Sequence, residues 1–278
     1  MDFVPDYTIA KRSVTPGYVG FTTYSRAYAV TNENLHKTMC LIPKNAKSAL
    51  VTAASGDHPL FCSLRGIENV DTFDISYNAK CIMDIKVIAL KYLGYHNYMH
   101  LLDDLFMVGH RSIDDFADIK HMPEILCNLP KIESDYLHAV NGAPLFSSGV
   151  RPTDSDCLFS SYEYSRLRKK VTKPYNFILT DIHYLGKRLT KSYDFIHLSN
   201  ILDYVSEGDY KETIVPLMEH VNVGGRIVAE TYDEEACDYF NHIGQEIANA
   251  NSNWIFSKKV YISSNFYKTR SAYLERIR

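Results

Sequence analysis

Small and acidic residues stand directly after several short apolar runs of the sequence, where an α/β protein carries its ligand-binding groups. Gly56 follows the run "SALVTAA", and Asp74 lies at the end of "NVDTFD". A carboxylate about 20 residues beyond such a glycine turn is placed to accept hydrogen bonds from ribose hydroxyls. Asp181 follows "FILT" and can accept from an adenine amino group, while the backbone amide of Ile182 donates to the ring. The pattern predicts a nucleoside-binding site.

The turn has one glycine, although a dinucleotide fold uses three so that its pyrophosphate can approach the backbone. Ser55, Asp57 and His58 surround Gly56 instead. The Asp57 carboxylate would repel a phosphate but suits an ammonium or sulfonium cation. We therefore predict that the ligand is S-adenosylmethionine, a nucleoside without phosphate. The residues expected to contact it are Ala54, Ser55, Gly56, Asp57, Asp74, Ile75, Asp181, Ile182, Ser199 and Asn200.

Each acid also has a purely structural interpretation. Asp57 fits as the N-cap of the helix that follows it. Asp74 can cap the helix that starts near Ser76, and Asp181 taken alone is an ordinary loop acid. The order of these sites along the chain is the order that one bound ligand requires, and this favours the binding interpretation.

The elements that must position these residues alternate between strand and helix. The strand-like runs include "SALVTAA", "NVDTFDI", "YNFILTDI", "YDFIHLSNIL" and "GGRIVAETY", and "SYNAKCIMDIKVIALKYLG" is the clearest helix. The final runs, "WIFSKKVYISS" and "FYKTRSAYLERI", predict two antiparallel strands. The alternation predicts an α/β fold with a Rossmann-like, doubly wound, mostly parallel sheet. Ligands of such sheets bind beyond the carboxyl ends of the strands.

The strand pattern stops at Leu102 and resumes at Tyr175. Over residues 95–170, "NYMHLLDDLF", "SIDDFADI" and "PEILCNL" predict short helices. The expected division is an N-terminal segment at 1–40, a Rossmann-like domain at 41–102 and 171–278, and a helical insertion over the cofactor site at 103–170.

Composition bears on partners and location. The net charge of −3 and the pI of about 6.4 give no basic excess for a nucleic-acid partner, and the one dense basic run, "SRLRKK", is interpreted as a solvated helix face. No apolar stretch approaches the ~20 residues of a membrane helix. The six cysteines form no CxxC pair or zinc-type cluster. We therefore expect no metal site, no integral membrane segment, and reduced thiols in a cytoplasmic protein.

The order "VTAASGDHPL", "VDTFDIS", "ILTDI", "YDFIHLSN" and "VGGRIVAETY" resembles the class I S-adenosylmethionine-dependent methyltransferase fold. Within that superfamily, "TAASGDHPL", "FDISYNAKCIMDIKVIALKYLGYHNYMHLL" and "YDFIHLSNILDYV" look like motifs of the 3-amino-3-carboxypropyl transferases of the betaine-lipid synthase type. The resemblance covers residues 40–102 and 174–232, and "DIS" departs from that family's typical acid–leucine–asparagine. It implies that Gly56, Asp74, Asp181 and the Ser199–Asn200 pair contact the cofactor.

Three functions fit this pattern. The first is transfer of the aminocarboxypropyl group to a small-molecule or lipid acceptor. The second is methyl transfer to a small molecule, and the third is a non-enzymatic S-adenosylmethionine-binding module. An alcohol or ammonium acceptor requires a general base, and the candidates near strand ends are His58, His183 and Tyr204. His197 is expected inside its strand and is set aside as a base.

Overall fold

The computed structural model describes residues 5, 22–108, 119–139, 146–147, 159–263 and 267–278. The predicted helix at "SIDDFADI" lies almost wholly outside these residues. The chain divides into two compact units. The first comprises residues 1–32, 53–60 and 74–179, and the second comprises 33–52, 61–73 and 180–278.

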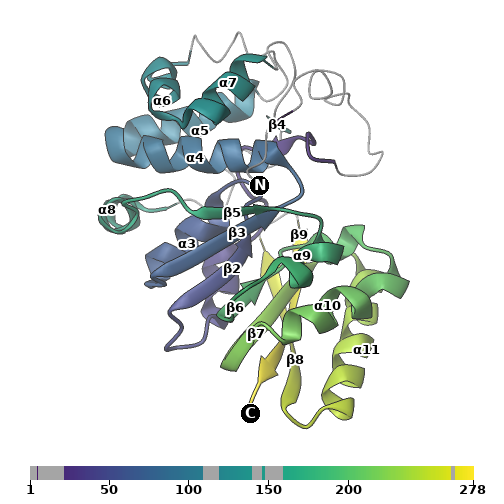
Figure 1. The fold of residues 1–278 in the computed structure, drawn as a ribbon. Coiled ribbons are helices and arrows are strands. Elements are labelled where there is room, and N and C mark those ends of the chain that lie inside the picture. Colours follow the sequence, from purple (N-terminus) through teal and green to yellow (C-terminus); the bar gives the residue numbers. More distant parts are fainter. Residues whose placement is uncertain (1–4, 6–21, 109–118, 140–145, 148–158, 264–266) are drawn as a thin grey trace. The chain divides into compact units, whose positions relative to one another are not determined.

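The main sheet has seven strands in the order β5-β3-β2-β6-β7-β9-β8 (Figure 1). The β2, β3, β6 and β7 strands are parallel to their neighbours among these four, whereas β9 is antiparallel to both β7 and β8. The order reverses on the two sides of β2, which is the topological switch point of a doubly wound fold. The strand bounds are β2 Ser48–Thr52, β3 Asn69–Asp74, β5 Asn176–Leu179, β6 Tyr193–His197, β7 Val221–Thr231, β8 Trp254–Ser263 and β9 Tyr267–Arg276.

Three parallel strands of the second unit end together at the carboxyl edge of the sheet. Thr52 at the end of β2 pairs with Phe73 of β3, and Val51 pairs with His197 at the end of β6. The β2 strand is buried from Ala49 onward, as its unbroken apolar sequence predicts for a strand covered on both faces. The register therefore puts the residues that follow β2, β3 and β6 at one edge.

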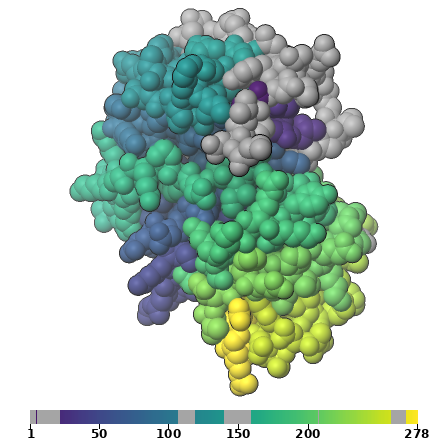
Figure 2. All heavy atoms as spheres, viewed as in Figure 1, coloured from purple at the N-terminus to yellow at the C-terminus, as the bar shows by residue number. Residues whose placement is uncertain are grey.

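The helices of the second unit pack beside one another and against the sheet. The α10 helix contacts α9 and β7, and α11 contacts β7, β8 and β9. Figure 2 shows α10 and α11 forming a continuous surface on the viewed side of this unit. The elements are α2 Leu35–Thr38, η1 Met39–Leu41, α9 Ile182–Arg188, η4 Ile201–Tyr204, η5 Glu207–Asp209, α10 Tyr210–Met218 and α11 Glu234–Ala250.

The first unit is built around α4, Tyr77–Tyr92, which is buried almost all round. A helix with this pattern belongs to a core, and α4 contacts α6, α8 and the short strand β1. Its side-chain cap is Ser76, as the sequence predicts, because the Ser76 hydroxyl accepts from the backbone N–H of Asn78. The other elements are β1 Ala27–Tyr28, α5 Tyr95–Val108, α6 Met122–Asn128, α7 Lys131–Ala139, β4 Phe146–Ser147 and α8 Ser161–Lys170, and α3, Asp57–Arg65, spans the division between the units.

The predicted strands, the antiparallel closing pair and the long helix are confirmed. Two differences stand out. The short parallel pair of β1 and β4 has no strand signal in the sequence. The described residues of the predicted insertion, 103–170, belong to one compact unit with residues 74–102, which the sequence assigns to the Rossmann-like domain. The described cysteines are free thiols: Cys40, Cys62, Cys81, Cys127 and Cys237.

Candidate functional site

In the first unit, Asp74 ties the end of β3 to the turn that follows β2. Its Oδ2 accepts from the backbone N–H of Ala54 at 2.9 Å, and its Oδ1 accepts from that of Ser76 at 2.9 Å. Burial raises the pKa of Asp74, against hydrogen bonds from the Ser76 and Ala54 backbones that lower it. The side chains of Asp74 and Ile75 are half-buried. A carboxylate has about four lone-pair sites, more than the backbone N–H groups of Ala54, Ile75 and Ser76 occupy, so Asp74 can still accept from a ligand hydroxyl.

Ala54 adopts a left-handed backbone conformation, with φ of 43°. An L residue with a side chain reaches this region at an energetic cost, and such outliers cluster at functional sites. The turn is held by the Asp74 carboxylate and by a hydrogen bond from the Gly56 N–H to the Ala53 carbonyl at 2.6 Å.

Gly56 is required by its φ of +82° and by the close approach of α4. A Cβ at this position would lie 2.8 Å from the Cα of Met83. The sequence predicts that Gly56 contacts the ligand. The structure adds a packing role, because the side on which a Cβ would stand is occupied by α4.

Asp57 begins α3 and forms a buried ion pair with Lys86 of α4. The Lys86 Nζ lies 2.6 Å from Asp57 Oδ1, and both side chains are almost fully buried. The other carboxylate oxygen, Oδ2, accepts from the Thr31 backbone N–H at 2.9 Å and from the Ser55 hydroxyl at 2.6 Å. The Asp57 charge is therefore already balanced within this unit. His58, the next residue, is also buried.

In the second unit, Ser199 follows β6 in a left-handed conformation, with φ of 56°. Its hydroxyl donates to the Glu33 carboxylate, and its carbonyl accepts from the Glu230 backbone N–H at 2.9 Å. Ser199 and Glu33 are both buried. The half-buried Asn200 is the N-cap residue of η4, and its carbonyl accepts from the backbone N–H of Asp203. Hydrogen bonds from the side chain and to the backbone of Ser199 therefore fix the left-handed turn after β6.

Asp181 is the N-cap of α9. Its Oδ1 accepts from the His183 backbone N–H at 2.9 Å and lies 2.6 Å from the His183 ring Nδ1. The His183 Nε2 lies 3.9 Å from the Asp209 carboxylate. A carboxylate that holds one ring nitrogen orients the imidazole for proton exchange at the other. Ile182 is buried, whereas Tyr204 in η4 is 50% exposed.

Asp203 of η4 is a candidate proton-exchanging residue that the sequence analysis does not include. Its Oδ2 accepts from the Tyr232 backbone N–H at 3.0 Å, just after β7 ends. Among the described residues, its Oδ1 is buried and has no hydrogen-bond partner. Burial raises the pKa of Asp203 to about 6, and the nearby Asp233 and Glu33 carboxylates add to the shift. A carboxyl group with this pKa can exchange a proton near neutral pH.

Buried charged and polar groups cluster beneath the ends of β6 and β7. The Glu230 carboxylate accepts from the Thr38 hydroxyl, and the His197 Nε2 lies 3.7 Å from Glu230 Oε1. His197 is the last residue of β6 and is fully buried, and it belongs to the strand, as predicted. The signal for Glu230 is an acid within the apolar strand "RIVAET", and Asp203 has its signal in the predicted motif "LSNILDYV". Glu33 has no such signal, because its partner Ser199 is distant along the chain.

The predicted residues are divided between the two compact units. Ala54, Ser55, Gly56, Asp57, His58, Asp74 and Ile75 belong to the first unit, and Asp181, Ile182, His183, Ser199, Asn200 and Tyr204 belong to the second. In the part of the chain that the structure describes, three residues other than glycine have positive φ, namely Ala54, His121 and Ser199. Two of the three therefore follow strands whose carboxyl ends the sequence assigns to the ligand.

No protein-family model matches the sequence, and no curated protein matches it. Solved structures with a similar fold include an rRNA methylase from Streptococcus thermophilus, at 12% identity and a TM-score of 0.43, covering 90% of this chain and 99% of that one. An N-methyltransferase from Bradyrhizobium japonicum WM9 in complex with S-adenosyl-L-homocysteine has 9% identity and a TM-score of 0.45, covering 98% of both chains. Magnesium protoporphyrin IX methyltransferase from Synechocystis PCC 6803 with bound S-adenosylmethionine has 11% identity and a TM-score of 0.44, covering 98% and 91%. With TM-scores below 0.5, these likenesses establish neither an activity nor a ligand for this chain.

None of the helices in the described ranges has both the length and the apolar character needed to cross a bilayer.

Proposed function

We propose that the chain binds S-adenosylmethionine and transfers a group from it to an acceptor. The observation that carries the proposal is the left-handed conformation of Ala54 and Ser199, which follow the adjacent parallel strands β2 and β6. Strained backbone at the carboxyl edge of a doubly wound sheet, beside its switch point, is where such folds bind their ligands.

The residues of the two groups suit the parts of a nucleoside. The half-buried Asp74 carboxylate would accept from the ribose hydroxyls, with Ile75 beside it. Asp181 would accept from the adenine amino group, and the Ile182 backbone amide would donate to the ring. Ala54, Ser55 and Gly56 would line the turn under the ligand. These roles remain proposals drawn from position and chemistry.

Asp57 is less suited to a ligand's ammonium group than its position in the sequence suggests. Lys86 already balances its charge, and the Ser55 hydroxyl and Thr31 amide occupy its second oxygen. We therefore propose Asn200 as the main group for the amino-acid arm. Its amide can donate to a carboxylate and accept from an ammonium group, and it is half-buried at the end of β6.

S-Adenosylmethionine would supply a sulfonium-activated carbon, so this chain's residues contribute mainly alignment, which is worth roughly 7–11 kcal/mol for well-oriented reactants. A proton from an alcohol or ammonium acceptor requires a base. His58, His183 and Tyr204 are candidates from the sequence. Asp203 joins them because its pKa of about 6 suits proton exchange near neutral pH.

Within this proposal we favour transfer of the 3-amino-3-carboxypropyl group. The support is the resemblance carried by "SGDHPL", the uninterrupted α4 after "FDIS", and "LSNILDYV". The acceptor is proposed to be a small molecule or lipid, selected by the N-terminal segment and residues 103–170. Methyl transfer is the alternative, and a binding module without turnover is the third possibility.

Calorimetry with S-adenosylmethionine tests the proposal. Replacing Asp74 with Ala should weaken binding by about 1–3 kcal/mol, because ribose hydroxyls would lose a buried partner. The matched control is Glu68→Ala, which removes an exposed acid just before the other end of β3 and should leave the affinity unchanged. Absence of binding to the wild-type chain would refute the proposal, and equal affinities for the wild type and Asp74→Ala would remove Asp74 from the site.

A further inference from the structure

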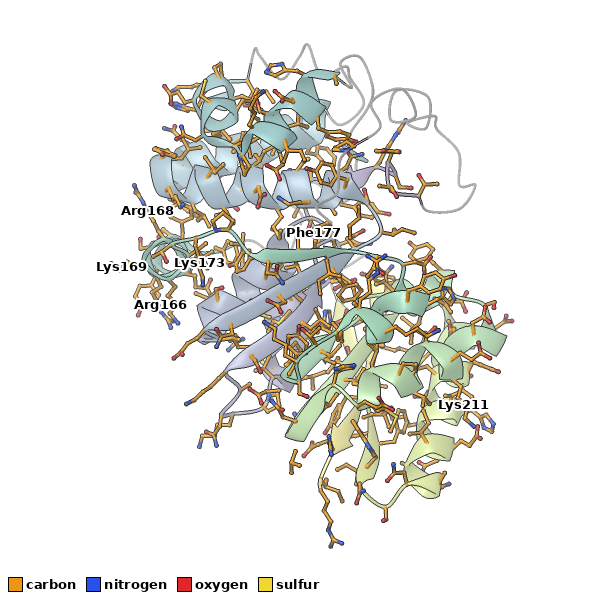
Figure 3. The ribbon with its side chains drawn as sticks, viewed as in Figure 1. Arg166, Arg168, Lys169, Lys173, Phe177 and Lys211 are labelled. Carbon is orange, nitrogen blue, oxygen red and sulfur yellow. The ribbon has the colours of Figure 1, made fainter. Side chains whose placement is uncertain are left out.

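The first unit carries a basic surface on α8 and at the end of α4. The stretch 164–180 contains five Lys and Arg residues and no Asp or Glu, although the whole chain is acidic. Lys91, at the end of α4, adds another exposed cation. Figure 3 shows Arg166, Arg168, Lys169 and Lys173 gathered around α8. The "α8 basic surface" comprises Lys91, Arg166, Arg168, Lys169, Lys170 and Lys173.

Internal contacts hold this surface rigid. The α8 helix starts with a capping box in which Ser160 and Glu163 satisfy each other's backbone N–H groups. The Tyr164 hydroxyl donates to the Leu93 carbonyl at 2.9 Å, and Arg168 Nη2 donates to the Lys91 carbonyl at 2.8 Å. The two segments therefore present their cations as one preformed surface.

Aromatic rings lie among the cations. Tyr162 is 70% exposed, and the Arg166 guanidinium lies 5.8 Å from the centre of its ring. Tyr92, beside Lys91, is 56% exposed. Single-stranded nucleic acids bind to surfaces of this type. Their bases stack on the aromatic rings and guanidinium planes, and their phosphates interact with the positive charges.

Two simpler explanations account for less of this surface. Cations in the last turn of a helix interact favourably with its dipole, which explains Arg168, Lys169 and Lys170 of α8 and Lys91 of α4, but not Arg166 or Lys173. A membrane-surface helix inserts an apolar face. The α8 helix does not offer such a face, because its residues Tyr164 and Leu167 are buried inside the first unit.

We propose that the α8 basic surface binds single-stranded RNA. This departs from the interpretation of "SRLRKK" as a solvated face and from the exclusion based on net charge, because phosphates respond to the local potential rather than to the charge of the whole chain. The surface would bind without strong sequence preference, since stacking accepts every base. The inference is independent of the proposed transfer reaction.

Fluorescence anisotropy with an oligo(U) RNA of about 20 nucleotides, a length that spans one to a few typical single-strand sites, tests it on the full chain. We expect affinity to fall steeply between roughly 50 and 200 mM salt. The double variant Lys169→Glu/Lys173→Glu should bind about 10-fold more weakly or worse, with the salt slope reduced by about 1.4 for two lost phosphate contacts. Its control, Lys44→Glu/Lys258→Glu, makes the same charge change at exposed lysines of the second unit and should retain wild-type affinity.

A second pair of variants keeps the net charge constant. Tyr162→Ala should weaken RNA binding about 5-fold or more through lost stacking, whereas Tyr184→Ala, which removes an exposed tyrosine of α9, should not. Undetectable RNA binding at low salt would overturn the proposal. Equal losses in the reversed-charge variant and its control would also overturn it, as would binding to phosphatidylserine vesicles without binding to RNA.

Discussion

Single residues at the carboxyl edge of the sheet have local environments unlike those of ordinary loop residues. Ala54 and Ser199 hold left-handed backbone conformations, and the carboxylates of Asp74 and Glu33 fix them through hydrogen bonds. Asp203 combines a pKa of about 6 with a buried oxygen that has no partner among the described residues. These environments cost stability, which is why they indicate function.

Asp203 should make folding stability depend on pH. Its folded-state pKa of about 6 exceeds the value of about 3.9 expected for an unfolded Asp. The folded chain therefore holds more protons between these values, and the free energy of unfolding falls as pH rises from about 4 to 6. Asp203→Asn removes this loss while keeping an oxygen for the Tyr232 amide. The free energy of unfolding of the variant, relative to that of the wild type, should therefore be about 1–2 kcal/mol higher at pH 7.5 than at pH 4, with the partial exposure of Asp203 taken into account.

Urea unfolding of both proteins at the two pH values measures this difference. A second variant, Asp233→Asn, keeps a side-chain cap for α11, because Asn caps a helix about as well as Asp. Because the Asp233 charge raises the pKa of Asp203, the free energy of unfolding of this variant should fall less than that of the wild type as pH rises. If the free energy of unfolding of Asp203→Asn changes with pH in parallel with that of the wild type, the pKa of Asp203 is not raised by folding.

At the scale of elements, the start of α3 and the middle of α4 are joined by a buried ion pair and by a glycine that permits close contact. The Lys86–Asp57 pair lies within the first unit, and the Met83 backbone approaches Gly56 there. These contacts position the turn that follows β2. A shift of α4 would therefore move the residues proposed to line the ligand.

Replacing Lys86 with Met should destabilise the fold by about 3–5 kcal/mol, because it leaves the Asp57 charge buried without its partner. The double variant Lys86→Met/Asp57→Asn removes both charges and should recover part of that loss. Thermal and denaturant unfolding measure both variants. If the single variant is as stable as the wild type, the pair is not buried as described.

Gly56→Ala should destabilise the fold by about 1–3 kcal/mol, since the new Cβ would meet the Met83 backbone at a positive φ. The control is Gly94→Ala, where a Cβ would meet nothing within 4 Å. Equal stability of the two variants would contradict the close contact between the turn and α4.

The sequence predicted most elements because apolar runs and caps are local signals. The run at β2, the helix from Asp57 to Arg65 and the Ser76 cap of α4 all follow from neighbouring residues. The Asp57–Lys86 pair and the Ser199–Glu33 bond connect residues far apart in sequence. Local patterns carry no information about such partners. The environments of Asp57 and Asp203 could therefore not be predicted, although the strand-end positions could.

At the scale of the whole molecule, the chain has two compact units, and the residues proposed to hold the nucleoside are divided between them. Asp74 and the glycine turn belong to one unit, whereas Asp181 and Asn200 belong to the other. A ligand that binds the folded chain and not the unfolded chain raises the free energy of unfolding. We therefore expect S-adenosylmethionine at 100 times its Kd to raise the free energy of unfolding by about 2.7 kcal/mol.

The residues that grip the amino-acid arm decide which carbon is presented to the acceptor. A methyltransferase holds the arm still and points the methyl group outward, whereas an aminocarboxypropyl transferase turns the arm itself toward the acceptor. Asn200→Ala should therefore slow turnover more than it weakens cofactor binding, because alignment acts in the transition state. Kinetics with saturating cofactor, compared with calorimetry on the same variant, measure the two effects. Equal losses of turnover and of cofactor affinity would indicate that Asn200 contributes to cofactor binding and not to alignment.

Mass analysis of the nucleoside product decides the reaction. The chain is incubated with a subsaturating concentration of S-adenosylmethionine and a cell extract that contains candidate acceptors. The control is the Asp74→Ala variant under the same conditions, where its weaker cofactor binding should lower turnover. Transfer of the aminocarboxypropyl group leaves methylthioadenosine, and this product is expected in excess over the control. Formation of S-adenosylhomocysteine instead would establish methyl transfer, and binding of S-adenosylmethionine without either product would contradict a transferase.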